Sequence, residues 1–267
     1  MPVNPLFNKI IAENYENYLG PIFNDVYAQD LTRRLASHKI NSILETACGT
    51  GQVTRFLREI LPETRIVSTD LNPGMIEMAK KVVRENDKIE WNNANAEELP
   101  YDSSIFDAVI CQFGLMFVPD KQKAVNEAYR VLKSGGRFIF NTWDSLEKNN
   151  ISRMANDTVN SFFKDNPPDF FRIPFSMHNP IEIEKLLQNS GFSNITVENV
   201  LYTGYADSAA DTVKALISGT PVYIAICERD EKMLPDIQQT LLKKIESEFG
   251  TELLKFSLSA WVAEGVK

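Results

Sequence analysis

The stretch Ile43-Leu44-Glu45-Thr46-Ala47-Cys48-Gly49-Thr50-Gly51 decides the fold. It begins as an apolar strand and ends in two glycines, and residues 53–60 continue with helical spacing. Glycines at such a turn let the backbone approach a ligand, and the following helix offers unpaired N–H groups. A second predicted strand, 65–69, leads to Asp70, 19 residues beyond Gly51. An acid at this distance can accept hydrogen bonds from both hydroxyls of a ribose, so a ribose-bearing ligand is predicted.

Short β-rich runs alternate with helical patterns along the rest of the chain. Further strands are expected at 88–91, 106–111, 137–141, 195–202 and 254–262, and helices within 10–35 and at 73–83, 120–133, 182–188 and 234–249. Alternation of this kind is typical of a parallel sheet with crossover helices. We therefore predict an α/β fold with a Rossmann-like, seven-stranded, mostly parallel sheet, helices on both faces, N-terminal helices and an inserted helical lid.

The chain divides into four expected segments. Residues 1–36 are an N-terminal helical segment and residues 37–143 the ligand-binding Rossmann-like core. Residues 144–180, rich in Pro and Phe, are an inserted lid. Residues 181–267 supply the remainder of the core, with a second lid segment at about 203–232.

The composition excludes several kinds of partner. Lys and Arg number 28 against 36 Asp and Glu, a net charge of -8 that repels a phosphate backbone, so no nucleic-acid partner is expected. The three cysteines are far apart in sequence, which excludes a disulfide framework and favours a cytoplasmic location. The two histidines lie in no metal-binding pattern. No apolar run is long enough to span a membrane, and the first residues lack the apolar core of a signal peptide.

Details of the glycine turn distinguish between ribose ligands. A dinucleotide site favours G-x-G-x-x-G, and Thr54 stands at the third glycine position. Glu45 precedes the turn, where a carboxylate opposes a diphosphate. S-adenosylmethionine carries no phosphate, and its α-ammonium attracts an acid. An NAD-dependent oxidoreductase is the disfavoured alternative.

Four segments in order resemble class I S-adenosylmethionine-dependent methyltransferases, in the subgroup typified by the ubiquinone and menaquinone biosynthesis methyltransferases. The resemblance covers roughly residues 40–143, and its segments are 43–51, 69–75, 95–101 with 106–109, and 130–137. Two positions depart from the pattern: Ala47 replaces a frequent glycine, and Asn95 replaces a frequent aspartate.

The resemblance implies S-adenosylmethionine as cofactor, no metal, and in-line methyl transfer to a small molecule. It implies that Glu45 orients the methionine ammonium and Asp70 the ribose, while Tyr15 closes over the cofactor. The cofactor-binding set that it implies is Tyr15, Glu45, Ala47, Gly49, Thr50, Gly51, Asp70, Leu71, Met75, Asn95, Ala96, Glu97, Gln112 and Phe113.

The acceptor side is less defined by the sequence. Phenylalanines between residues 162 and 175 favour an apolar or aromatic acceptor if they face the pocket, and otherwise pack the lid. His178 is the candidate general base, set against the structural role that a single histidine usually has. A non-catalytic or regulatory S-adenosylmethionine-binding protein is the open alternative. The acceptor, the methylated atom (O, N, C or S) and the oligomeric state stay undefined.

Overall fold

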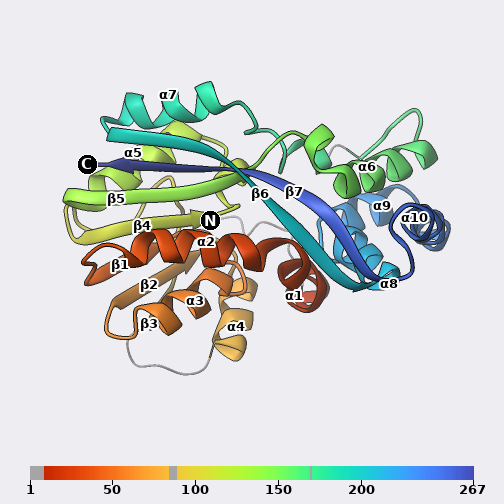
Figure 1. Cartoon of the computed structure of the whole chain (residues 1–267), viewed down its shortest axis with the longest axis horizontal. Helices are drawn as coiled ribbons and strands as arrows, with labels where there is room; N and C mark the ends of the chain where they lie inside the picture. The colour runs from red at the N-terminus through yellow and green to blue at the C-terminus, as the bar shows by residue number, and fades with distance from the viewer. Residues whose placement is uncertain (1–8, 84–88, 169) are drawn as a thin grey trace.

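A single seven-stranded sheet runs through the molecule in the order β3-β2-β1-β4-β5-β7-β6 (Figure 1). The computed structural model describes residues 9–83, 89–168 and 170–267. Strands β1 to β5 pair in parallel, and β7 is antiparallel to both β5 and β6. The strands are β1 (Ser42–Glu45), β2 (Arg65–Asp70), β3 (Ile89–Asn93), β4 (Phe106–Gln112), β5 (Leu132–Trp143), β6 (Ser193–Ser208) and β7 (Glu252–Val266). The predicted α/β, Rossmann-like architecture is confirmed.

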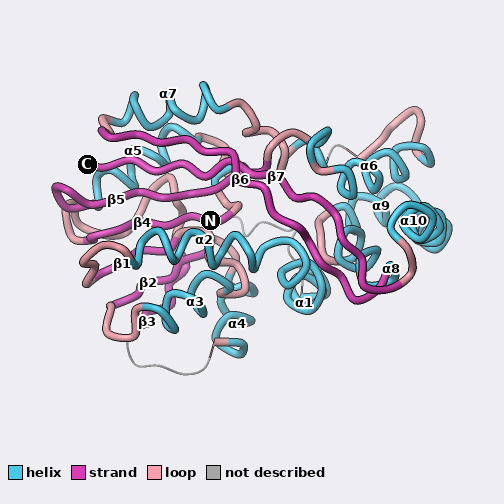
Figure 2. The backbone as a smooth tube through the Cα atoms, in the orientation of Figure 1, coloured by secondary structure: helices cyan, strands magenta, loops and turns pink. Residues whose placement is uncertain are grey.

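Helices cover both faces of the sheet (Figures 1 and 2). One face packs on α2 and α3 through a cluster that includes Leu31, Leu57 and Ile110, and the other packs on α5 and α7 through Val125, Leu187 and their neighbours. The helices are α1 (Lys9–Asn14), α2 (Asp25–Ala36), α3 (Gln52–Ile60), α4 (Pro73–Val82), α5 (Lys121–Val131), α6 (Asn150–Phe162), α7 (Pro180–Ser190), α8 (Ala209–Val213), α9 (Val222–Asp230) and α10 (Leu234–Phe249). Because helices cover both faces of the sheet, the sequences of the central strands are continuous apolar runs.

The N-terminal helical stretch changes its winding between α1 and α2. Tyr15–Asn24 form a π-helical segment, η1, with Pro21 inside it. Proline lacks the N–H that an α-helical ladder needs, and such wide turns are frequent at functional sites. The two helices expected within residues 10–35 are therefore joined by a widened turn.

Long-range pairing moved one predicted boundary. The helix expected to reach residue 133 ends at Val131, and β5 starts at Leu132. Gly135 has a left-handed φ of 77°, and Gly135 and Gly136 pair with the last residue of the chain. Gly135 N donates to Lys267 O at 2.8 Å, and Lys267 N donates to Gly136 O at 2.9 Å.

Strands β6 and β7 are longer than the sequence pattern predicts and extend past the rest of the sheet. They pair from Ser193 with Val266 to Ser208 with Glu252, and their far ends lie among α6, α8, α9 and α10 (Figure 1). The apolar face of α10 packs there in the same core as Phe256 and Leu258. This helical lobe stands beyond the carboxyl ends of the parallel strands, the edge where ligands bind in open α/β sheets.

Candidate active site

A cavity of about 420 Å³ opens at the carboxyl ends of the parallel strands. Its walls include the residues that follow β1, β2, β3 and β4, together with η1 and the helical lobe. Eleven residues of the predicted cofactor set line it: Tyr15, Ala47, Gly49, Asp70, Leu71, Met75, Asn95, Ala96, Glu97, Gln112 and Phe113. Residues from distant parts of the sequence thus meet at one site.

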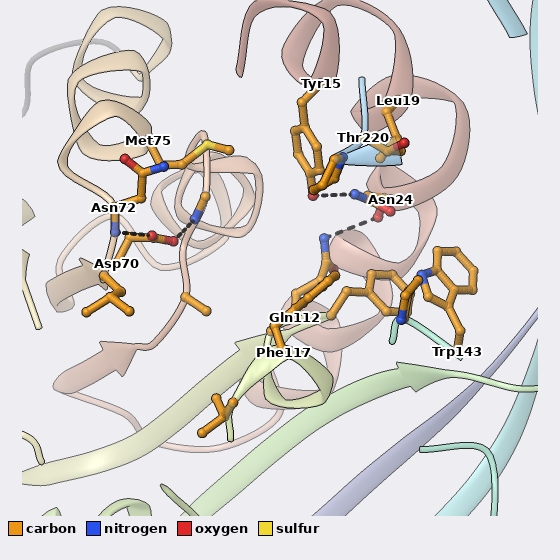
Figure 3. A pocket seen from close by; sticks show the side chains of 18 of the residues that line it. Tyr15, Leu19, Asn24, Asp70, Asn72, Met75, Gln112, Phe117, Trp143 and Thr220 are labelled. Carbon is orange, nitrogen blue, oxygen red and sulfur yellow. Dashed lines mark hydrogen bonds between the residues drawn. The ribbon is translucent and has the colours of Figure 1, made fainter. Parts of the chain in front are cut away.

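Asp70 is held in place by the backbone on both sides (Figure 3). Its Oδ2 accepts a hydrogen bond from Gly49 N at 2.9 Å, and its Oδ1 accepts one from Asn72 N at 2.8 Å. Burial raises the pKa of Asp70, and these two N–H groups oppose the rise. Each carboxylate oxygen keeps a lone pair. Two adjacent hydroxyls of a ligand can therefore bond to this carboxylate.

The glycine turn presents Gly49 to the cavity. Gly49 has a φ of +55°, and nothing lies within 4 Å of the place where its Cβ would stand. Gly51, at φ +82°, faces the other way: a Cβ there would lie 2.9 Å from Val83 Cγ2 and 3.2 Å from Ala79 Cβ. Gly49 therefore leaves room for a ligand, whereas Gly51 allows the turn to pack on α4.

Glu45 lies behind the turn and is 1% exposed. Its Oε2 accepts hydrogen bonds from the hydroxyls of Thr54 and Ser68, the latter at 2.9 Å. Burial raises the pKa of Glu45 to about 7, against the effect of these two hydroxyls and with a smaller contribution from Asp70. Neither Glu45 nor the buried Thr50 and Gly51 is among the residues that line the cavity. These three members of the predicted set support the turn from behind.

Ala47 occupies the position where the resemblance favours glycine, and it has a left-handed φ of 51°. Its methyl group fits because Gly114 stands opposite. A Cβ on Gly114 would lie 2.4 Å from Ala47 Cβ. The cavity wall therefore has room for one methyl group at these two positions, and Ala47 supplies it.

The loop after β3 lines the same half of the cavity as Asp70. Asn95 Oδ1 accepts from Glu97 N at 3.0 Å, and Glu97 Oε1 accepts from Asp120 N at 2.7 Å. Leu71 and Met75 supply apolar side chains to the cavity lining. The Asn95 side chain thus stabilises its own loop, whereas the resemblance predicts that it binds a ligand.

Tyr15, Asn24 and Gln112 form a polar row across the cavity from Asp70 (Figure 3). Asn24 Nδ2 donates to the Tyr15 hydroxyl at 2.6 Å, and Gln112 Nε2 donates to Asn24 O at 3.5 Å. Burial raises the pKa of Tyr15, so its hydroxyl stays protonated. Asn24 was missed by the sequence reasoning, which carried no signal beyond a polar residue in a helical pattern.

The remaining part of the cavity is aromatic and apolar. Phe113 stacks on Trp143 with ring centroids 4.0 Å apart and planes at 6°. Phe170, Phe171 and Phe175 of the expected lid line the cavity, whereas Phe162 and Phe163 do not line it and pack against the hydrophobic core. The lining residues that sequence reasoning missed include Leu19, Phe23, Trp143, Ser152, Leu216, Thr220 and Pro221.

His178 is not brought to this cavity. It lies in a separate depression with Glu147 and Arg172, and its Nδ1 is 2.7 Å from Phe175 O. The candidate general base therefore does not line the cavity that contains Asp70 and Gln112. No group of three or more His, Cys, Asp or Glu within residues 9–83, 89–168 and 170–267 could hold a metal ion. In the same ranges, no helix combines the length and apolar character of a membrane span.

The sheet order and the cavity at its carboxyl edge define a class I methyltransferase fold, and solved structures agree. Phosphoethanolamine N-methyltransferase 2 of Haemonchus contortus matches with a TM-score of 0.64 at 18% identity, over 99% of this chain and 59% of that one. A putative methyltransferase from Bacillus halodurans matches with a TM-score of 0.57 at 19% identity, over 90% of this chain and 98% of that one.

Sequence comparisons then assign the core segment. Residues 44–140 match a family described as a methyltransferase domain. Ubiquinone/menaquinone biosynthesis C-methyltransferases match as well. That of Klebsiella pneumoniae is 38% identical over 155 residues, 50% of this chain and 62% of the relative. That of Zymomonas mobilis is 36% identical over 116 residues, 43% of this chain and 47% of the relative. The chain thus spans about half the length of these relatives, and the resemblance expected from the four segments is confirmed.

Proposed function

We propose that the chain is an S-adenosylmethionine-dependent methyltransferase that acts on a small molecule. The observation that carries this proposal is the Asp70 carboxylate, which lines the cavity, is fixed by Gly49 N and Asn72 N, and keeps a lone pair on each oxygen. Gly49 leaves open space at the same cavity. The match of residues 44–140 to a methyltransferase domain supports it.

The residues present fit this cofactor. Asp70 accepts hydrogen bonds from the ribose hydroxyls, and Leu71 and Met75 contact the adenine. Gly49 and Ala47 lie beside the methionine portion, with Tyr15 across the cavity from them. The cofactor supplies an electrophilic methyl group on its sulfonium. The protein's own contribution is to exclude water and to hold the acceptor atom in line with that methyl group.

The acceptor occupies the aromatic part of the cavity. Phe113 and Trp143 form one wall, and Phe170 and Phe171 from the 144–180 segment form another. Leu216 and Thr220, from the 203–232 segment, complete the enclosure. Stacked rings at this spacing favour a flat apolar or aromatic molecule. Both segments therefore act as lids in this proposal.

The cellular setting follows from composition. Cys48, Cys111 and Cys227 are free in the structure, which supports a reducing compartment and a cytoplasmic enzyme. The net charge of -8 supports a small molecule over a nucleic acid as substrate.

Calorimetric titration tests the cofactor assignment. S-adenosylmethionine and S-adenosylhomocysteine are expected to bind with micromolar affinity and NADH not at all. Asp70→Ala is expected to weaken both adenosyl ligands by about tenfold or more, because two hydrogen bonds to a carboxylate are lost. Asp157→Ala, at an exposed position on α6, is the matched control and should bind as the wild type does.

The outcomes separate the alternatives. A folded protein that binds neither adenosyl ligand, or that binds NADH in their place, would overturn the proposal. A protein that binds S-adenosylmethionine but forms no S-adenosylhomocysteine with any of a broad panel of small acceptors would instead favour the non-catalytic alternative.

A further inference from the structure

Two buried amide oxygens in the cavity have no hydrogen-bond partner in the part of the chain that the structure describes. They are Asn24 Oδ1 and Gln112 Oε1. Both residues line the cavity, and Figure 3 shows them adjacent, between Tyr15 and Trp143. A buried polar atom without a partner is destabilising unless a ligand or water completes the bond. These oxygens therefore mark a place where a donor from a ligand or a water completes the bond.

The donor ends of the two amides are already engaged. Gln112 Nε2 donates to the backbone oxygen of Asn24, a group that can only accept, so the orientation of the Gln112 amide is fixed. Asn24 Nδ2 donates to the Tyr15 hydroxyl at 2.6 Å. Each amide nitrogen thus has one of its two hydrogens engaged, and the buried atoms left without a partner are the two oxygens, which belong to side chains with no net charge.

Asn24 is also diverted from the role that its position favours. It immediately precedes α2, where asparagine commonly caps the helix with its side chain. Here Asn24 makes no side-chain cap hydrogen bond, and its side chain is directed instead to Tyr15. The residue is 2% exposed and closes the π-helical segment η1. The Asn24 side chain thus contributes to the cavity lining and leaves the first turn of α2 without a side-chain cap.

The charges around the cavity point the same way. No Lys, Arg or His is among the described residues that line it, and Asp70 and Glu97 are its acids. A carboxylate or phosphate on the acceptor would find no cationic side chain among these residues and would face two more oxygens at Asn24 and Gln112. A hydroxyl, by contrast, supplies a hydrogen to one of these oxygens, and a primary amine can supply one to each.

We propose that Asn24 and Gln112 are specificity-determining residues that accept hydrogen bonds from an O–H or N–H group on an aromatic acceptor. Acceptors that carry a hydroxyl or amine bind, while anionic acceptors and those without a donor are rejected. This inference rests on the proposed function, because it requires the acceptor to share the cavity with the cofactor.

The test uses four naphthalene probes and the protein saturated with S-adenosylhomocysteine. Calorimetry gives the Kd of 2-naphthol, 2-naphthylamine, 2-methoxynaphthalene and 2-naphthoate. We expect 2-naphthol and 2-naphthylamine to bind about tenfold tighter than 2-methoxynaphthalene, and 2-naphthoate to be weakest, since a site with unpaired acceptors rejects an analogue without the donor.

Variants assign the preference to the two oxygens. Gln112→Met and Asn24→Leu are expected to reduce the tenfold preference to about twofold or less. Asn24→Asp should retain most of it, because its carboxylate keeps an acceptor oxygen for the ligand and can accept from the Tyr15 hydroxyl. Gln188→Met, at an exposed amide on α7, is the matched control and should leave the preference unchanged. Gln112→Met keeps the test informative if Asn24→Leu does not fold.

Binding of S-adenosylhomocysteine is measured first, which separates this inference from the proposed function. Loss of that binding in the wild type would defeat the proposed function itself. The inference alone fails if the cofactor product binds but 2-methoxynaphthalene equals 2-naphthol, if none of the probes binds, or if the preference survives in Gln112→Met. It also fails if Gln112→Met weakens S-adenosylhomocysteine about tenfold and leaves the probe preference intact, because the oxygens then serve the cofactor.

Discussion

The backbone N–H of Phe113 donates a 2.8 Å hydrogen bond to Oδ1 of Asn141, which is fully buried on the neighbouring strand. Phe113 has a φ of 46°, in the left-handed region that bulky residues avoid. The bond ties this strained residue to β5, and Trp143, two positions further along β5, stacks on the Phe113 ring. One amide therefore fixes the aromatic wall on which the acceptor is proposed to lie.

Asn141→Leu should destabilise the protein by about 1–3 kcal/mol, because the Phe113 N–H is left buried and unpaired. Loss of the stacked arrangement should also weaken the near-ultraviolet circular dichroism signal. Thr142→Val is the matched control: Thr142 is equally buried, its hydroxyl has no hydrogen-bond partner in the described structure, and stability should change little. Equal stability of the two variants in urea unfolding would contradict the role assigned to Asn141.

Gly114→Ala should be destabilising by about 1–3 kcal/mol, because the new methyl group would overlap Ala47 Cβ. Ala47→Gly alone should change stability by less than about 1 kcal/mol, since relief of a left-handed alanine offsets the added freedom of the unfolded chain. The double variant should recover most of the loss. Its remaining contact is with Cys111 Sγ, 2.9 Å from the new Cβ.

A double-mutant cycle in urea unfolding measures this coupling. The double variant Ala47→Gly, Gly114→Ala should be destabilised by about 1 kcal/mol or more less than the sum of the two single effects. Simple additivity would show that the cavity wall relaxes around Gly114 by some other movement.

The turn after β1 could be predicted from sequence because its signals are local. Strand, glycine turn and helix follow one another within twenty positions, and Asp70 closes the next strand at a fixed distance. The capping Asn72 ahead of Pro73 is equally local, and its Oδ1 accepts from Gly74 N at 2.9 Å as its position predicts. Short-range patterns of this kind predict local structure without knowledge of the rest of the fold.

The acceptor side could not be predicted, because its residues are neighbours only after folding. Asn24 and Gln112 are joined by a hydrogen bond across 88 positions of sequence. Trp143, Leu216 and Phe171 line one cavity, but they come from segments whose local patterns do not report which way a side chain points. Glu45 shows the reverse problem: the resemblance predicts that it orients the methionine ammonium, but burial and the bond from Thr54 place it behind the turn.

Glu45 should make stability depend on pH. Burial raises its pKa from 4.5 to about 7, so between these values the folded state binds more protons than the unfolded state. The free energy of unfolding should therefore fall as pH rises through this window, by on the order of 3 kcal/mol, and level off above it.

Urea unfolding of the wild type and Glu45→Gln between about pH 5 and 8 measures this dependence. Glu45→Gln should lack that part of the slope, and Glu248→Gln, at an exposed position on α10, should keep it. If the free energy of unfolding depends on pH in the same way in the wild type and in Glu45→Gln, another residue is the group that titrates.

Arg55 should couple the N-terminal segment to the cofactor turn. Its Nη1 lies 3.0 Å from Glu16 Oε1 and its Nη2 lies 3.6 Å from Asp25 Oδ1, so one guanidinium on α3 holds both ends of the segment that carries Tyr15, Leu19 and Asn24. Arg55→Met should leave two partly buried carboxylates facing one another without a cation. We expect S-adenosylhomocysteine to bind about fivefold more weakly, because Tyr15 is then held less firmly over the cavity.

Adding Glu16→Gln to Arg55→Met should restore part of that affinity, because it removes the repulsion between the two acids. This recovery distinguishes an electrostatic tether from a simple packing role, which a second substitution would not repair. Calorimetry at low and high salt gives a further measure: the wild-type affinity should fall as salt rises, and that of Arg55→Met should change less. Wild-type affinity in Arg55→Met at low salt would show that the N-terminal segment is held without this ion pair.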